Sequence, residues 1–267
     1  MGKIDFFIGP CVLESKELAF TVADFLKKEL AFLDSKINIS FKGSYDKANR
    51  SSIDSYRGPG IDAGLKILEQ VNKEFGFQTI TDYHSPAEAQ IVAKVVDTLQ
   101  VPAFLCRQTD MILAGAKACS ENGARLKVKK GQFLSPADTK NIVDKARNYL
   151  NFEDILLTER GTSFGYNNLV VDMGSFQIMK SFGVKTIHDC THCVQMPGGL
   201  GGTTGGKREQ IIPLARAAAA AGADGFFIEA HPDPAKALSD STNQLPLTQI
   251  KSLVTDLVQI KELLNGK

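Results

Sequence analysis

The sequence lacks several features that mark particular classes of protein. Its 267 residues include no apolar run of about 18 residues, the usual minimum for a membrane-spanning helix, and no signal-peptide pattern. Neither sign of charge dominates, since 31 Lys and Arg residues balance 30 Asp and Glu residues. Proteins that coat nucleic acid usually carry a strong basic excess. We therefore predict no membrane partner and no nucleic-acid partner, and we expect a soluble globular protein.

Cysteine is scarce and odd in number. Five cysteines in a chain of this size argue against a disulfide framework and favour reduced thiols in the cytoplasm. Two of them form the motif Cys190-Thr191-His192-Cys193, which by itself could indicate a redox pair or half of a zinc knuckle. No second C-x-x-C is found, and a redox pair is expected to open the helix after a first strand. The redox interpretation is therefore disfavoured.

Short apolar strands alternate with amphipathic helices along the chain. The expected strands are 4–8, 37–40, 77–81, 98–101, 125–129, 155–158, 185–187 and 225–228. The expected helices are 14–33, 60–75, 86–96, 110–119, 136–150, 176–182, 208–221 and 246–264. Such alternation is typical of parallel strands joined by right-handed crossovers. In a chain of this length it predicts a closed (β/α)₈ TIM barrel, in a single catalytic domain over residues 1–267.

Two nucleotide-binding interpretations are less favoured. A doubly wound open sheet would need a glycine-rich fingerprint after its first strand, where this chain has Gly9-Pro10-Cys11. Gly201 to Lys207 resembles a Walker loop, but Arg208 stands where Ser or Thr must hold magnesium. We interpret residues 197–206 instead as a mobile loop over the mouth of the barrel.

Polar residues follow every predicted strand, and in such a barrel the carboxyl ends of the strands form the active site. The residues are Cys11, the segment 42–52, Asp82, His84, Arg107, Gln108, Lys129, Lys130, Glu159, Arg160, Asp189, His192, Glu229 and His231. The segment 42–52 places cations among Ser44, Asn49, Ser51 and Ser52. Such a loop could simply be solvated. However, cations gathered at one mouth repel one another unless a ligand neutralises them, which predicts an anionic substrate with more than one phosphate or carboxylate.

Cys11, His192, Glu229 and Asp240 follow strands that are adjacent around the predicted barrel. Thiolate, imidazole and carboxylate ligands together suit a divalent ion such as zinc or iron. The residues leave an alternative equally open, in which Cys11 fills a packing position, His192 caps a loop and Asp240 begins a turn.

Longer motifs resemble a known family. They are Gly9-Pro10-Cys11, Phe41-Lys42, residues 46–52, Tyr56-Arg57-Gly58, Thr81-Asp82 with His84, residues 102–105 with 107–110, residues 129–133, residues 164–172 and Glu229-Ala230-His231-Pro232. Over Gly9 to Pro246 the chain resembles the 3-deoxy-D-manno-octulosonate 8-phosphate synthases. The related heptulosonate 7-phosphate and sialic acid synthases share the barrel and the chemistry, but are not expected to combine the segments at 46–52 and 164–172.

The resemblance implies condensation of phosphoenolpyruvate with D-arabinose 5-phosphate and water, a step toward the lipopolysaccharide of Gram-negative bacteria. It implies that phosphoenolpyruvate binds to Lys42, Lys47, Lys129 and Arg160. It further implies that the aldose phosphate binds to Asn49, Arg50 and Ser51, with Arg107 supplied by a neighbouring subunit of a homotetramer. Other residues implied in substrate binding are Ser44, Asp82, Ala103 and Gln108, and those implied in catalysis are Cys11, Lys42, His84, Lys129 and His192.

The family divides into a metal-dependent class with Cys after the first strand and a metal-independent class with Asn there. Cys11, Pro197-Gly198-Gly199 and Ser239-Asp240-Ser241 resemble the metal-dependent class. This implies a divalent ion, such as zinc, iron, manganese or cadmium, on Cys11, His192, Glu229 and Asp240, and no organic cofactor. Rival functions are a metal-dependent aldolase that uses pyruvate and a sugar-phosphate sensor without turnover.

Overall fold

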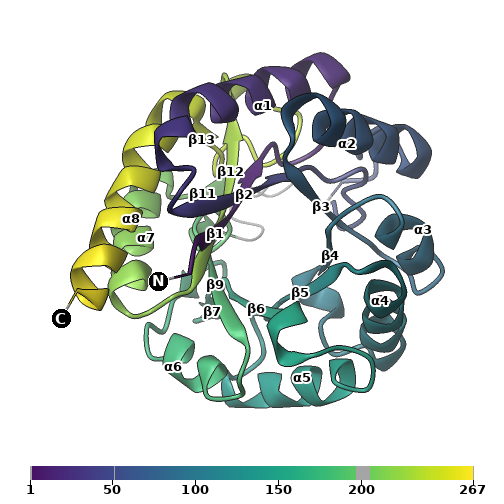
Figure 1. The fold of residues 1–267 in the computed structure, drawn as a ribbon, viewed down its shortest axis with the longest axis vertical. Coiled ribbons are helices and arrows are strands. Elements are labelled where there is room, and N and C mark those ends of the chain that lie inside the picture. Colours follow the sequence, from purple (N-terminus) through teal and green to yellow (C-terminus); the bar gives the residue numbers. More distant parts are fainter. Residues whose placement is uncertain (1, 51, 197–204, 267) are drawn as a thin grey trace.

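Eight parallel strands close into a barrel in the computed structural model, which describes residues 2–50, 52–196 and 205–266 (Figure 1). The barrel strands are β1 (Ile4–Gly9), β2 (Ile37–Lys42), β3 (Gln78–Asp82), β4 (Thr98–Val101), β5 (Arg125–Lys129), β6 (Ile155–Glu159), β9 (Lys185–Asp189) and β12 (Gly225–His231). Each strand pairs with the next in this order, and β1 pairs with β12 to close the ring, with Phe6 opposite Phe226. The predicted (β/α)₈ barrel is confirmed.

Helices surround the barrel on its outside (Figure 1). They are α1 (Lys16–Leu30), α2 (Ile61–Phe75), α3 (Ala89–Ala93), α4 (Thr109–Asn122), α5 (Lys140–Ala146), α6 (Ser175–Lys180), α7 (Ile211–Ala220) and α8 (Ile250–Asn265). Ser15 caps α1 by accepting a hydrogen bond from the N–H of Leu18 at 3.1 Å. No helix in the described ranges is both long and apolar enough to cross a lipid bilayer.

The hydrophobic core has two layers because side chains alternate across each strand. Phe6 and Ile8 face outward and belong to the large core between the strands and the helices. Phe7 faces inward, where it packs with Ile80 and Phe227. Leu156 and Ile187 complete this inner cluster. The cluster fills the barrel interior, so the barrel is a packed structure and not a pore.

Some helices are shorter than expected. Helical residues begin at Ala89 rather than at Pro86, and α8 begins at Ile250, after a 3₁₀ turn over Leu247–Gln249 that directly follows Pro246. Proline has no N–H to donate, which favours a place before the regular part of a helix. Pro246 in fact belongs to a two-residue strand, β13 (Leu245–Pro246), which pairs in parallel with β12.

Two hairpins that we did not predict lie after barrel strands. Strands β7 (Thr162–Ser163) and β8 (Leu169–Val170) form one after β6. Strands β10 (Gln195–Met196) and β11 (Gly205–Gly206) form the other after β9. Most of the loop predicted to be mobile, residues 197–204, lies outside the described residues, and so does Ser51.

A buried carboxylate lies at the amino end of the barrel, where it joins the starts of several strands. Asp5, at the start of β1, accepts from Lys185 Nζ at 2.9 Å and lies 3.4 Å from Arg125 Nη1. Asn38 Nδ2 donates to its other oxygen at 3.2 Å. All four residues lie at the starts of strands, at the opposite end from the predicted site.

Candidate active site

A cavity of about 590 Å³ opens at the carboxyl ends of the barrel strands. The predicted site residues that line it are Lys47, Asn49, Arg50, Asp82, His84, Ala103, Lys129, Arg160, His192 and Asp240. They come from loops and strand ends that are far apart in the chain, which the closed barrel brings to one mouth. The size suits a small-molecule ligand.

Four further predicted residues are buried and contact the lining residues or one another. Lys42 forms an ion pair with Glu229, whose other oxygen lies 3.4 Å from His192 Nε2. Ser44 donates to Asp82 Oδ2 at 2.6 Å. The Cys11 Sγ atom lies 3.3 Å from Asp240 Oδ2.

Arg107 and Gln108 are not brought to this cavity. Both are exposed, and Arg107 lines a separate depression together with Asp138 and Lys145. Within one chain, therefore, Arg107 is not available to a ligand in the main cavity.

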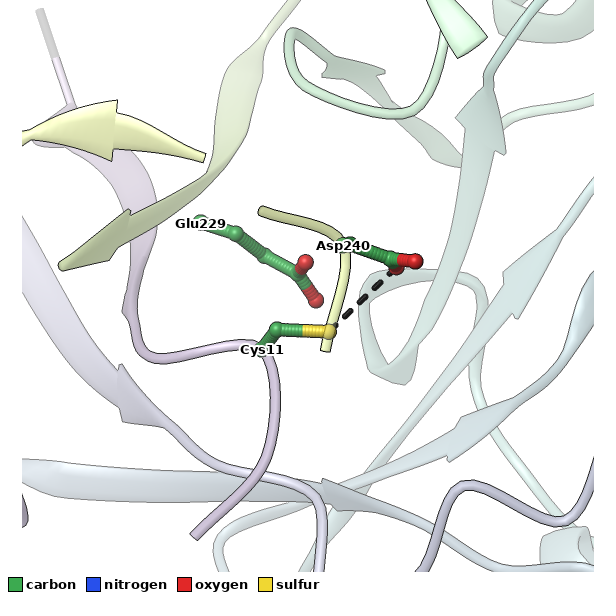
Figure 2. A group of neighbouring side chains, drawn as sticks. All are labelled: Cys11, Glu229 and Asp240. Carbon is green, nitrogen blue, oxygen red and sulfur yellow. Dashed lines mark hydrogen bonds between the residues drawn. The ribbon is translucent and has the colours of Figure 1, made fainter. Parts of the chain in front are cut away.

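Three ligand-type side chains converge beside the cavity. Figure 2 shows Cys11 with the carboxylates of Glu229 and Asp240, and their donor atoms all lie within 4.8 Å of one another. His192 joins them, because its Nε2 lies 3.4 Å from Glu229 Oε2 and 3.7 Å from Asp240 Oδ2. The geometry thus brings together all four residues that we predicted as metal ligands.

The chemistry of this cluster fits a divalent cation. Glu229 Oε2 is buried and accepts no hydrogen bond from the described residues, which leaves its lone pairs available to a cation. Burial, together with the charges of Asp240 and Glu229, raises the pKa of the Cys11 thiol well above its usual value. A bound cation would reverse that effect, since a coordinating thiol is deprotonated. One thiolate, one imidazole and two carboxylates form a donor set that zinc or iron accepts.

The backbone holds Cys11 and Lys42 in close contact. A side chain at Gly9 would place its Cβ 1.9 Å from the backbone oxygen of Lys42, so only glycine allows these strand ends to meet. The Lys42 ammonium then donates to the backbone oxygens of Pro10 and Cys11, at 3.2 and 2.6 Å. The thiol-bearing loop is thereby fixed to β2.

Asp189, to which we assigned no individual role from the sequence, orients His192. It accepts from the backbone N–H of His192 at 2.9 Å and lies 2.9–3.0 Å from the Nδ1 atom. Burial alone would raise the pKa of Asp189, but His192 and Lys129 hold it well below its usual range. An ionised Asp189 favours a proton on Nδ1 and leaves Nε2 free as a ligand atom toward Glu229 and Asp240.

The cations of the cavity are each held by acceptors. Lys129 Nζ lies 3.0 Å from Asp189 Oδ2, and Arg160 donates to Gln195 Oε1 at 2.7 Å and to the His192 backbone oxygen at 3.0 Å. Lys47 Nζ lies 3.7 Å from Glu229 Oε1. Side chains restrained in this way can bind an anionic ligand without first being ordered.

A buried network that sequence reasoning missed supports Asp82. Lys127 is fully buried inside the barrel and donates to Gln100 Oε1 at 2.7 Å, while the Gln100 amide donates to Asp82. Burial, and secondarily Lys129, lowers the pKa of Lys127 well below its usual value. The alternation of Lys127 and Lys129 along β5 places both on the inner face, and this was the sequence signal that could have identified Lys127.

The C-x-x-C motif forms no disulfide. All five cysteines are free and buried. Cys193 Sγ lies 3.8 Å from Nε2 of His188, and His188 does not belong to the ligand cluster. Burial raises the pKa of both Cys190 and Cys193 well above the usual value, which makes them poor nucleophiles.

Comparison with known proteins identifies the family. A model of the DAHP synthetase I family matches residues 2–265. The chain belongs to the DAHP synthetase I family. Three similar relatives are named 2-dehydro-3-deoxyphosphooctonate aldolase. For each of them, the last two percentages below are the aligned share of this chain and the aligned share of the relative. They come from Campylobacter jejuni subsp. jejuni serotype O:23/36 strain 81-176 (50% identity over 275 residues, 99% and 98%), Azoarcus sp. strain BH72 (52% over 260, 97% and 91%) and Albidiferax ferrireducens (50% over 257, 94% and 88%).

In this member of the DAHP synthetase I family, we expect Asp189→Asn to weaken the binding of a divalent ion. The substitution removes the carboxylate that fixes the His192 tautomer, and losing such a partner typically lowers metal affinity about 10- to 100-fold. The measurement is the dissociation constant of Co²⁺ in chelator-stripped protein, determined by competition with a chelator of known affinity.

Asp5→Asn is the matched control, because Asp5 is also buried and paired with cations but lies at the amino end of the barrel. It should lower stability and leave the affinity for Co²⁺ unchanged. Equal affinities in wild type and Asp189→Asn would contradict the role assigned to Asp189.

Proposed function

We propose that the protein condenses phosphoenolpyruvate with D-arabinose 5-phosphate and water, giving 3-deoxy-D-manno-octulosonate 8-phosphate and phosphate. The observation that carries the proposal is one cavity that joins several cations to a cluster of ligand-type residues. Relatives of about half-identical sequence, named 2-dehydro-3-deoxyphosphooctonate aldolase, support the same reaction. The product is a precursor of lipopolysaccharide.

Phosphoenolpyruvate carries a phosphate and a carboxylate, and both require cations. Lys47, Lys129 and Arg160 line the cavity and would bind these groups, with Lys42 buried behind Glu229. In the reaction, C3 of phosphoenolpyruvate forms a bond to the aldehyde carbon, water adds oxygen to C2, and phosphate departs with cleavage of its C–O bond. Fixed cations hold the reactants together and stabilise the charge that develops on the phosphate and the aldehyde oxygen.

The sugar phosphate would bind at the other side of the cavity. Asn49 and Arg50 line it, and Ser51, which lies outside the described residues, directly follows Arg50 in the sequence. His84 also lines the cavity, where its ring would contact the sugar, and its buried Nδ1 atom lies 3.8 Å from Glu88 Oε2. We assign Asp82, Ser44 and Ala103 to the same substrate-binding group, and leave out Gln108, which lies outside this cavity.

Cys11, His192, Glu229 and Asp240 would hold the divalent ion. When bound, the ion supplies Lewis-acid activation of water or orientation of the aldehyde. Asp189 orients His192 through its Nδ1 atom, and Lys42 holds Glu229 in place. No organic cofactor is part of the proposal.

The proposal extends to the domain organisation, the oligomeric state and the cellular compartment of the protein. We propose a single catalytic domain in a cytoplasmic homotetramer, in which Arg107 serves the cavity of a neighbouring subunit. Its exposed position away from the cavity of its own chain supports this arrangement. The free state of all five cysteines supports a reducing compartment.

A related synthase of the heptulosonate 7-phosphate or sialic acid type is the second candidate. The name of the matching family supports it, since DAHP synthetase I refers to the heptulosonate reaction. Both alternatives would use phosphoenolpyruvate, so the identity of the aldehyde substrate separates them.

The direct test is release of phosphate from phosphoenolpyruvate plus arabinose 5-phosphate. We expect activity in the purified protein, loss of activity after stripping with a chelator, and recovery when one divalent ion is added back. Cys11→Ala should show no recovery because the thiolate ligand is missing.

Other outcomes would redirect the proposal. Activity in a verified metal-free preparation would contradict the role of the ion and keep the synthase. Activity with phosphoenolpyruvate and erythrose 4-phosphate or N-acetylmannosamine, but not with arabinose 5-phosphate, would favour a related synthase. Activity with pyruvate in place of phosphoenolpyruvate would indicate a simple aldolase. Binding of both substrates without turnover would indicate a sensor.

Substitution of Arg50 tests the sugar-phosphate side of the cavity. Removing a hydrogen bond to a charged group costs about 1.5–3 kcal/mol, which corresponds to about 10- to 100-fold in binding. We expect Arg50→Ala to raise the KM for arabinose 5-phosphate by that factor, with a much smaller effect on the KM for phosphoenolpyruvate. Steady-state kinetics with each substrate varied in turn measure both values.

Arg57→Ala is the matched control, because Arg57 lies near the same loop but is exposed and pairs with Asp46. It should leave both KM values near those of the wild type. A rise in the KM for phosphoenolpyruvate alone in Arg50→Ala would contradict the assignment.

A further inference from the structure

In the described part of the chain, no strand pairing connects the two loops that carry Cys11 and Asp240, which are the two ends of the ligand cluster. Cys11 follows β1 and Asp240 lies beyond β12. The ladder between these strands ends with Gly9 opposite Glu229, so it fixes Glu229 but not the other two residues. Something else must set the distance between Cys11 and Asp240.

The side chain of Gln244 connects the two loops. It is fully buried, its Oε1 accepts from the backbone N–H of Cys11 at 3.2 Å, and its Nε2 donates to the backbone oxygen of Ser239 at 2.8 Å. Ser239 directly precedes Asp240. A single amide therefore spans from the residue that carries the thiol to the residue next to the carboxylate.

Gln244 is itself held by regular structure. It immediately precedes β13, in which Leu245 pairs with Ala230 and Pro246 pairs with His231. Its position is therefore set by the same strand, β12, that carries Glu229. The amide thus relates both loops to one rigid element.

The Asp240 loop needs such a restraint. Asp240 has a φ of +46°, in the left-handed region that non-glycine residues rarely adopt. The backbone N–H groups of Asn243 and Gln244 donate to the backbone oxygen of Asp240 at 2.9 and 3.2 Å, which closes the loop into a tight turn. Unusual backbone conformations persist where the surroundings fix them in several ways.

The same loop also reaches the thiol and the sugar-phosphate side. Ser239 Oγ lies 3.2 Å from Cys11 Sγ and accepts from Arg50 Nη1 at 2.6 Å. A shift of the 239–244 loop would therefore move Asp240 relative to Cys11 and disturb Arg50 together with them.

We propose that Gln244 is a positioning residue for the ligand cluster, which sets the spacing of Cys11 and Asp240 and so the affinity for the ion. This inference rests on the metal site put forward under the proposed function. Partners that orient the ligands of a metal commonly affect its affinity about 10- to 100-fold. We expect an effect of that size when the amide is lost.

The test uses Co²⁺ bound to the chelator-stripped, full-length protein. Thiolate-to-cobalt charge transfer gives an absorption band in the near ultraviolet that reports ligation by Cys11. In Gln244→Met, which keeps the approximate shape but has no amide, we expect affinity about 10- to 100-fold weaker and a weaker band per bound ion. In Gln244→Asn the side chain is one methylene shorter, and its amide cannot span both loops at their present spacing, so we expect a change in the same direction. This variant provides the test if Gln244→Met does not fold.

Asn72→Leu is the matched control, because its amide donates to the backbone oxygen of Phe77 at 2.8 Å, at the end of α2. It should lower the midpoint of thermal unfolding without changing the band or the affinity. A wild-type protein without a charge-transfer band would overturn both the metal site and this inference. A wild-type band that is equally strong in the folded Gln244 variants, with equal affinity, would overturn the inference alone.

Discussion

The ion pairs of buried Glu229 are the interaction on which the rest of the site depends. One of its oxygens faces Lys42 and Lys47, and the other faces His192. Burial alone would raise its pKa, but His192, Lys42 and Lys47 lower it to about 2, so the carboxylate is ionised at every physiological pH. Through this side chain, the cations suited to phosphoenolpyruvate and the ligands suited to a metal ion form one electrostatic unit.

The balance of charges also corrects an argument made from the sequence. We reasoned that the cations at the barrel mouth would repel one another unless a ligand neutralised them. The structure shows that carboxylates of the chain already do so in part, since Lys129 pairs with Asp189 and Lys130 lies 3.5 Å from Glu159. The prediction of an anionic ligand therefore depends on which cations line the cavity, and less on the number of cations. In a region of low dielectric constant, the Coulomb attraction within each of these pairs is stronger than it would be at the surface.

Sequence alone sufficed for the barrel and for most of the residues at its mouth, because the strand and helix periods were clear and parallel strands place their carboxyl ends together. The start of α3 at Ala89 was missed because Pro86 gave a misleading start signal. Gln244, Lys127 and the orienting role of Asp189 could not be predicted, since their functions depend on contacts across the barrel or between distant loops. The individual roles of the site residues remain predictions.

The most direct test of the account is X-ray absorption at the zinc edge of the zinc-loaded protein. The account predicts one sulfur ligand at about 2.3 Å, with nitrogen and oxygen atoms completing the shell. The sulfur signal should be absent in Cys11→Ala and present in Cys193→Ala. A shell without sulfur, or a sulfur signal that persists in Cys11→Ala, would contradict the claim that Cys11, His192, Glu229 and Asp240 form the metal site.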